Sequence, residues 1–187
     1  FGGWIRNGSA VTGSGRSVTF RETGGTTRVS GTVFGGMVAN GTVSSNSVTV
    51  NGGTIGTNSG FVYGGYVKSG SATNNSVTIS GGTISGRNIS VGDYAGGVYG
   101  GYVENTGSAT NNSVTISGGI ISGGVYGGYV KNAGSATNNS VTVENNSITV
   151  NGGTIAAAVV GGEVTNQSVT NNSVTVENNS VTVSGGT

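Results

Sequence analysis

One motif recurs along this chain and constrains its fold more than any other feature. A glycine pair between aromatic or aliphatic residues is followed by a Ser-Val-Thr segment and a Gly-Gly-Thr-like turn, and this order returns six times. Repeats of this length are typical of solenoids, propellers and arrays, whose units pack mainly on their neighbours. We therefore predict a single repeat domain over residues 1–187, with units that begin near Phe1, Phe34, Tyr63, Tyr99, Tyr126 and Val160.

The composition agrees with a thin core that is shared between stacked units. Glycine accounts for 40 of the 187 residues and 33% are hydrophobic, which is little for a thick globular core. Proline is absent, as expected where nearly every backbone N–H donates to a neighbouring strand. Histidine and cysteine are also absent, which removes the usual general base at neutral pH, the commonest metal ligand and any disulfide.

Within each unit, the order of polar and apolar residues predicts short strands. In residues 76–79 the alternation places Val77 and Ile79 on one face and two hydroxyl side chains on the other. The following glycine pair allows a turn, the Val-Tyr-Gly-Gly-Tyr-Val segment forms another strand, and residues 70–75 close the coil. The apolar period of a helix occurs nowhere without interruption by glycine pairs, so we expect no helix of consequence.

These strands predict an all-β fold, a β-solenoid (β-helix) of about six coils with Gly/Asn-rich turns, because identical strands that recur in every unit stack in register. The insertion between Ile84 and Val98 in the third unit would loop outward, whereas the extra residues of the fifth and sixth units come from a tandem heptad. The alternative is an antiparallel meander or sandwich in which the glycine pairs form hairpin turns. In the solenoid, the inward stacks would contain Val77, Ile79, Val114, Ile116, Val141 and Val143.

Two long strings are shared between units and resemble a known class of repeat. Gly-Gly-Val-Tyr-Gly-Gly-Tyr-Val and Gly-Ser-Ala-Thr-Asn-Asn-Ser-Val-Thr-Ile-Ser-Gly-Gly occur from Gly96 to Gly119, and the first returns from Gly123. They resemble repeats in the passenger regions of bacterial autotransporters and related large surface adhesins, most strongly from Val62 to Thr142. The resemblance implies a secreted β-solenoid, located outside the cell or on the bacterial cell surface.

Residues that could support other functions are sparse. The acidic residues are spread through the units and Asp93 is the only aspartate, so neither the clustered carboxylates of a glycan-cleaving site nor a repeated calcium motif is present. We expect no enzyme activity, no cofactor and no metal site. A net charge of +1 without a periodic basic stripe offers no surface to nucleic acid. The lack of an apolar band argues against membrane insertion.

Side chains at equivalent positions of the units would form ladders on the solenoid surface. Outward serines and threonines, such as Ser76 and Thr78, resemble the face of ice-binding solenoids, and the paired asparagines suit coil corners and amide ladders. Aromatic ladders usually pack neighbouring strands together, but they are also candidate ligand-facing groups that could stack on sugar rings of host or matrix glycans. The tyrosines concerned are Tyr63, Tyr66, Tyr99, Tyr102, Tyr126 and Tyr129.

The two ends of the chain carry complementary halves of one unit and opposite charge. Residues 1–28 hold four arginines against one glutamate, net +3, whereas residues 144–187 hold three glutamates and no base, net −3. Opposite charges at the ends would favour one polarity of stacking. The predicted head-to-tail interface consists of Phe1, Gly2, Gly3, Trp4, Ile5, Val181, Val183, Gly185, Gly186 and Thr187.

The sequence therefore predicts a structural protein that assembles through its ends. We expect a head-to-tail filament subunit or a stalk segment of a bacterial surface adhesin. Its partner would be another copy of itself, or the adjacent repeats of a longer chain. The first alternative is a glycan- or matrix-binding module that uses the tyrosines, and a minor alternative is an ice-binding solenoid.

Overall fold

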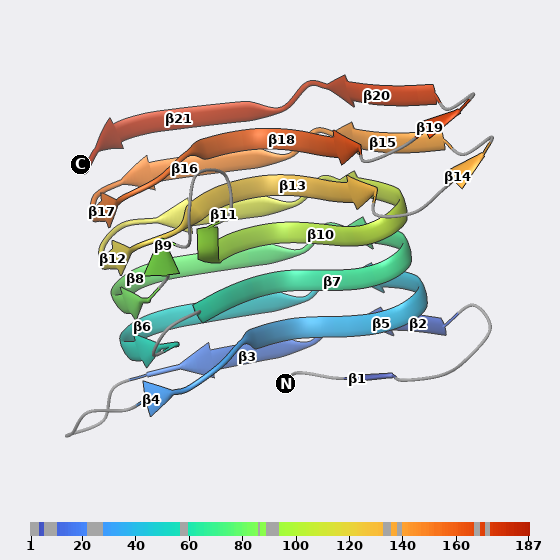
Figure 1. The fold of residues 1–187 in the computed structure, drawn as a ribbon. Helices are drawn as coiled ribbons and strands as arrows, with labels where there is room; N and C mark the ends of the chain where they lie inside the picture. The colour runs from blue at the N-terminus through green and yellow to red at the C-terminus, as the bar shows by residue number, and fades with distance from the viewer. Residues whose placement is uncertain are drawn as a thin grey trace.

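The computed structural model of the chain is an all-β solenoid built from parallel strands (Figure 1). It describes residues 4–5, 11–21, 28–56, 60–85, 87–88, 94–132, 136–137, 140–166, 169–170 and 173–187. Among these residues there is no helix, and every strand pair is parallel except that of β9 with β10. This arrangement confirms the solenoid and excludes the antiparallel meander.

Two stacked sheets form the walls of the solenoid. The first has ten strands, and its central order is β1 (Trp4–Ile5), β5 (Val33–Ser44), β7 (Gly60–Thr73), β10 (Tyr94–Thr110), β13 (Gly124–Asn132) and β18 (Val159–Asn166). The remaining strands of this sheet are β2 (Val11–Ser14), β9 (Arg87–Asn88), β15 (Ser140–Glu144) and β20 (Ser173–Glu177).

The second sheet has nine strands and carries the Ser-Val-Thr segments. Its members are β3 (Ser17–Phe20), β4 (Arg28–Val29), β6 (Ser47–Ile55), β8 (Ser76–Ile84), β11 (Ser113–Ile116), β12 (Ile120–Ile121), β16 (Ser147–Asn151), β17 (Thr154–Ile155) and β21 (Ser180–Gly185). A separate two-stranded sheet joins β14 (Ala136–Thr137) to β19 (Val169–Thr170).

Like residues lie above like residues in both sheets. In the first sheet Val62 pairs with Val33 on one side and Val98 on the other. In the second sheet Val114 pairs with Val77 and with Ile148. This in-register stacking is what exact repetition of the strand sequence favours, because each side chain meets a neighbour of the same size and polarity.

The interior is divided into two apolar cores by a narrow waist. One core contains Val77, Ile79, Val114 and Ile116, as predicted, and the other contains Val67 and Ala72. At the waist the glycine pair lies directly against the asparagine corner of the same coil. A Cβ added to Gly65 would come within 2.5 Å of Asn75 Nδ2, which no real side chain tolerates. The glycine pair is therefore required because the opposite backbone and amide occupy the space of a side chain.

The tandem heptad is placed differently from the prediction. Val143 is buried, but in the second core, where it pairs with Ala109, and the stack above Val114 is continued by Ile148 instead. Val141 belongs to β15 of the first sheet and pairs with Val174, and its burial lies outside the described residues. The first heptad thus takes the place of the Gly-Ser-Ala-Thr segment, and Val143 occupies the position that Ala109 has in the coil below.

The segment displaced by this heptad leaves the coil. Ala136 and Thr137, which the repeat predicted to close the fifth coil, pair instead with Val169 and Thr170 in the small sheet of β14 and β19. In the third unit, β9 pairs back on the start of β10, while Gly96 and Gly97 pair with Gly60 and Phe61 in the first sheet. This end of the predicted insertion is therefore part of the stack and does not loop outward, and residues 86 and 89–93 lie outside the described residues.

The solenoid has about four turns, against the six coils expected from the number of units. All six units contribute strands, but only those beginning at Phe34, Tyr63, Tyr99 and Tyr126 have a neighbouring unit on both sides. The residues of the buried apolar core accordingly run from Val33 to Val150. The first and last units form the two ends, and within the described residues one face of each is not covered by another coil.

Candidate functional site

The last coil leaves apolar side chains uncovered that are buried in every inner coil. Val181 is 42% exposed and Val183 is 63% exposed, whereas their register partners Ile148 and Val150 are 1% and 3% exposed. In the first sheet, Val174 and Val176 of β20 are also exposed. The predicted interface residues Val181 and Val183 therefore lie at an open end, and their exposure follows from the lack of a coil above them.

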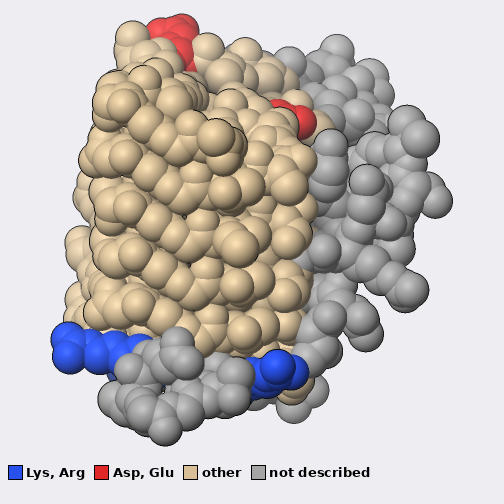
Figure 2. Space-filling model, turned by 90° about the vertical axis from the view of Figure 1, so that its left-hand side faces the viewer, with Lys and Arg blue, Asp and Glu red and all other residues tan. Residues whose placement is uncertain are grey.

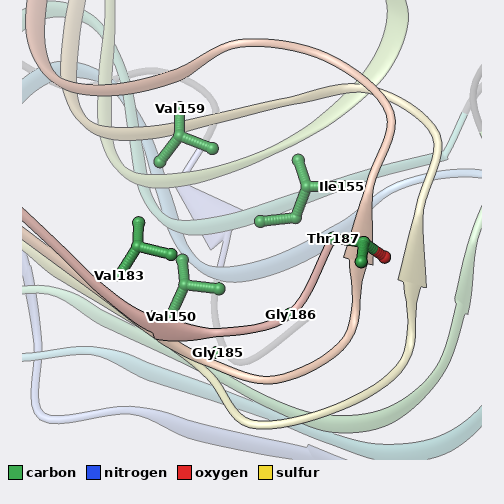
Figure 3. Close-up of a pocket in the computed structure, with 7 residues that line it drawn as sticks. All are labelled: Val150, Ile155, Val159, Val183, Gly185, Gly186 and Thr187. Atoms are coloured by element: carbon green, nitrogen blue, oxygen red, sulfur yellow. The ribbon is translucent and has the colours of Figure 1, made fainter.

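A hollow of about 180 Å³ opens at this end between β16, β17, β18 and β21 (Figure 3). The side chains of Val159, Ile155, Val150 and Val183 surround it, and the backbone of the last turn closes one side. Four residues of the predicted interface line the hollow, namely Val183, Gly185, Gly186 and Thr187. We did not predict from the sequence that Val150, Ile155 and Val159 lie at this end. The available signal was the Gly-Gly-Thr turn before Ile155, because the same three residues occur at positions 185–187.

The opposite end is formed by the first unit. Val18, Phe20 and Val29 are partly buried and pack on the first core from this side. Trp4 and Ile5 form β1 and pair with Met37 and Val38, which places these two predicted interface residues in the stack. Phe1, Gly2 and Gly3 lie outside the described residues.

Charge is separated along the solenoid axis. Exposed Arg16, Arg21 and Arg28 lie in the first unit, whereas Glu163 and Glu177 lie in the last. Figure 2 shows the same distribution, with basic side chains at one end, acidic ones towards the other and none in the middle of this face. Burial raises the pKa of Glu163 above its ordinary value.

The tyrosines form two stacked ladders, here called the tyrosine ladders, on the outside of the first sheet. Tyr63, Tyr99 and Tyr126 stack with ring centroids 5.0 Å and 4.9 Å apart, and Phe34 extends this ladder at 5.2 Å from Tyr63. The second ladder, Tyr66, Tyr102 and Tyr129, has spacings of 5.2 Å and 5.3 Å. Rings of the two ladders meet edge to face, for example Tyr99 and Tyr102 at 5.3 Å. Both geometries are favourable for aromatic pairs.

The tyrosine hydroxyls and rings are largely used within the protein. Tyr63 is 8% exposed and the other five are partly buried. The Tyr66 hydroxyl donates to Glu104 Oε2 at 2.6 Å, and the Tyr129 hydroxyl lies 2.8 Å from Thr165 Oγ1. Burial, together with the hydrogen bond and negative charge of Glu104, raises the pKa of Tyr66 above its ordinary value. This geometry is what a packing role requires.

A third ladder consists of asparagines at one corner of the coils, buried in the inner coils and partly buried at Asn179, and is here called the asparagine ladder. Its members are Asn46, Asn75, Asn112, Asn146 and Asn179. The residue before each inner member has left-handed backbone, such as Asn111 at φ 55°, which asparagine tolerates. The amide side chains form hydrogen bonds from coil to coil, as the sequence suggested. Their burial explains why the same corner recurs in successive units.

The outward hydroxyl array also exists, but it does not include every Ser-Val-Thr segment of the chain. In the second sheet, serines stack from Ser17 to Ser180 and threonines from Thr19 to Thr182, one of each per coil. The strands with Ser140 and Ser173 belong to the first sheet and are not part of this array. The serine and threonine side chains of the inner coils are partly buried by their neighbours above and below.

Other kinds of site find no support in the described part of the chain. No group of three or more acidic side chains lies close enough there to hold a metal ion. None of its segments forms a helix with the length and apolarity needed to cross a membrane. Comparisons with protein-family models, curated proteins and solved structures give no match for this chain. The two open ends and the surface ladders are therefore the features from which a function can be argued.

Proposed function

We propose that this chain is a structural β-solenoid that extends by stacking end to end, as a filament subunit or a stalk segment of a bacterial surface adhesin outside the cell. The main support for this proposal is that Val181 and Val183 of the last coil are exposed, although the residues in register with them are buried. Covering apolar surface of this kind stabilises association. An uncapped solenoid end also presents unpaired strand edges, which readily pair with another strand.

The first coil of a second copy matches the last coil strand by strand. If the stack continues with the same register, β3 lies above β21, and Val18 and Phe20 cover Val181 and Val183. In the first sheet, β1 lies above β18 and β2 above β20. Arginines of the first coil then approach the glutamates of the last coil, which favours this polarity over the reverse. The contact is heterologous and does not close on itself, so its product is an open filament.

Sedimentation at increasing protein concentration tests this proposal, with electron microscopy of the same samples. Wild type should associate into filaments with an axial repeat of about 30 Å, because the six stacked strands from β1 to β18 lie about 4.8 Å apart. Val183→Glu should abolish association, because it places a charge in the apolar contact. Thr182→Glu is the matched control: it lies next to Val183 on the outward face and should associate like wild type.

The filament subunit is refuted if wild type remains a monomer at high concentration and low salt, or if the two glutamate variants behave alike, and a stalk segment with another neighbour then becomes the better account. Raising the salt concentration should weaken association only modestly, because backbone pairing and apolar burial provide most of the affinity and the charges mainly set polarity.

A glycan-binding face is a second candidate, because Tyr66, Tyr102 and Tyr129 present a continuous and partly exposed row of rings. Sugar rings could stack on such a row. A glycan array probed with wild type and with Tyr102→Leu decides this: binding that is lost in the variant supports the candidate. The absence of any bound glycan would leave packing as the role of the tyrosine ladders.

A further inference from the structure

The asparagine ladder has a direction, and its two ends differ. Each fully bonded member makes the same four side-chain bonds. For Asn112, Oδ1 accepts from the backbone N–H and from Nδ2 of Asn75, both at 3.0 Å. Its Nδ2 donates to Ala72 O at 2.9 Å and to Asn146 Oδ1 at 3.0 Å. The backbone N–H and one amide N–H of each ladder asparagine thus point toward the coil that follows, where an amide oxygen receives both.

At the C-terminal end these donors have nothing to receive them. Asn179 Oδ1 accepts from the backbone N–H and Nδ2 of Asn146 at 3.0 Å and 2.8 Å, and Asn179 Nδ2 donates to Val143 O at 2.9 Å. Within the described residues, the backbone N–H of Asn179 and its second amide N–H have no partner. By the pattern of the inner coils, both require the Oδ1 atom of an asparagine in the coil stacked above.

At the N-terminal end the corresponding position is occupied by Arg16. Its backbone N–H donates to Asn46 Oδ1 at 3.1 Å, as the backbone of every ladder asparagine does to the next member. Its side chain, however, is a guanidinium, which has only donors and no acceptor. The first coil therefore cannot offer the oxygen that Asn179 requires.

We infer that Arg16 sets the strength of the end-to-end contact, and that the C-terminal end fits best a coil of this repeat with asparagine at the ladder position. This inference rests on the proposed stacking of a second copy. In that contact the two N–H groups of Asn179 face the guanidinium of Arg16, donors against a cation, while the valine contacts and backbone pairing are retained. The contact between two copies is then weaker than any contact between coils within one chain. The cause is Arg16, which provides no acceptor for the N–H groups of Asn179.

Replacement of Arg16 by asparagine tests this inference as a gain of affinity. In Arg16→Asn the new amide can donate to Asn46 Oδ1, as Asn75 does to Asn112, and its Oδ1 can accept both N–H groups of Asn179. Two recovered hydrogen bonds should tighten self-association about tenfold or more, measured by sedimentation equilibrium of the full chain. Arg16→Gln is the matched control, because its amide is one methylene too far out and should give no such gain. Equal thermal unfolding of both variants shows that they fold.

A double-mutant cycle with Asn179→Ala identifies the contact. The gain from Arg16→Asn should disappear in the Asn179→Ala background, whereas Asn179→Ala alone should change the association constant of wild type little. If Arg16→Asn and wild type associate equally, or if Arg16→Gln gains as much, the inference about Arg16 is wrong and the stacking proposal stands. If none of the variants associates, both are wrong.

Discussion

Asn112 offers the most direct test of what holds the coils together. This side chain is 0% exposed and makes four hydrogen bonds, two of them as acceptor from Asn75. In Asn112→Ala the backbone N–H of Asn75 and one of its amide N–H groups lose their acceptor. Both stay enclosed, because Asn75 is also 0% exposed. On the other side, Asn146 Oδ1 loses one donor but still accepts the backbone N–H of residue 112, which lies at 3.0 Å in the wild type.

The expected cost follows from those two donors. A buried donor left without a partner costs about 1–3 kcal/mol, so Asn112→Ala should lower the free energy of unfolding by about 2–6 kcal/mol. This is a large part of the roughly 5–15 kcal/mol that stabilises a typical domain. Asn111→Gly is the matched control at the adjacent position, where φ is 55° and the side chain is exposed. Glycine accepts this backbone, so we expect a change within about 1 kcal/mol.

Urea unfolding followed by circular dichroism measures both variants, and hydrogen exchange of the backbone amides shows whether the damage stays near the altered coil. A loss below about 1 kcal/mol in Asn112→Ala would show that water replaces the missing amide, and the asparagine ladder would then not be a main source of stability. Equal losses in the two variants would refute the reasoning in the same way.

Three further predictions concern the waist, the strand faces and the tyrosine ladders. Gly65→Ala should lower the free energy of unfolding, measured in urea, by about 1–3 kcal/mol or more, because its Cβ would meet Asn75. Gly31→Ala, which has open space around it, should be close to neutral. Equal effects would contradict the close approach of the glycine pair to Asn75 at the waist. Val114→Asp should lower the free energy of unfolding by roughly 3 kcal/mol or more, because it buries an unpaired charge. Thr115→Asp should lower it little, because this side chain lies on the outward face. Equal losses in the two variants would mean that the inward and outward faces of this strand are assigned wrongly. Burial raises the pKa of four ladder tyrosines, Tyr63, Tyr66, Tyr99 and Tyr102, so the folded state holds their protons to higher pH than the unfolded state does; their contribution to stability should be constant below pH of about 10 and fall above it. Ultraviolet titration of phenolates checks this, and titration of all tyrosines at their ordinary pKa would contradict it.

Much of the architecture could be predicted because it depends on local order repeated at a distance. The alternation in residues 76–79 determines that Val77 and Ile79 share a face, whatever lies opposite them. Repetition of that segment then favours parallel stacking in register, since only this arrangement brings identical faces together in every coil. The same argument placed the tyrosines above one another and the asparagines at the corners, and the structure confirms both.

Three features were decided only by tertiary packing. The segments 140–143 (Ser-Val-Thr-Val) and 147–150 (Ser-Ile-Thr-Val) have the same local pattern of polar and apolar residues. The choice between them depends on which segment places a side chain beside Ala109 and which continues the stack above Val114. The waist exists because two separate segments of one coil approach within the space of a side chain. The unmet donors of Asn179 depend on what lies in the next coil. Local sequence determines which way a side chain points, whereas its partner across the coil depends on how the whole turn closes.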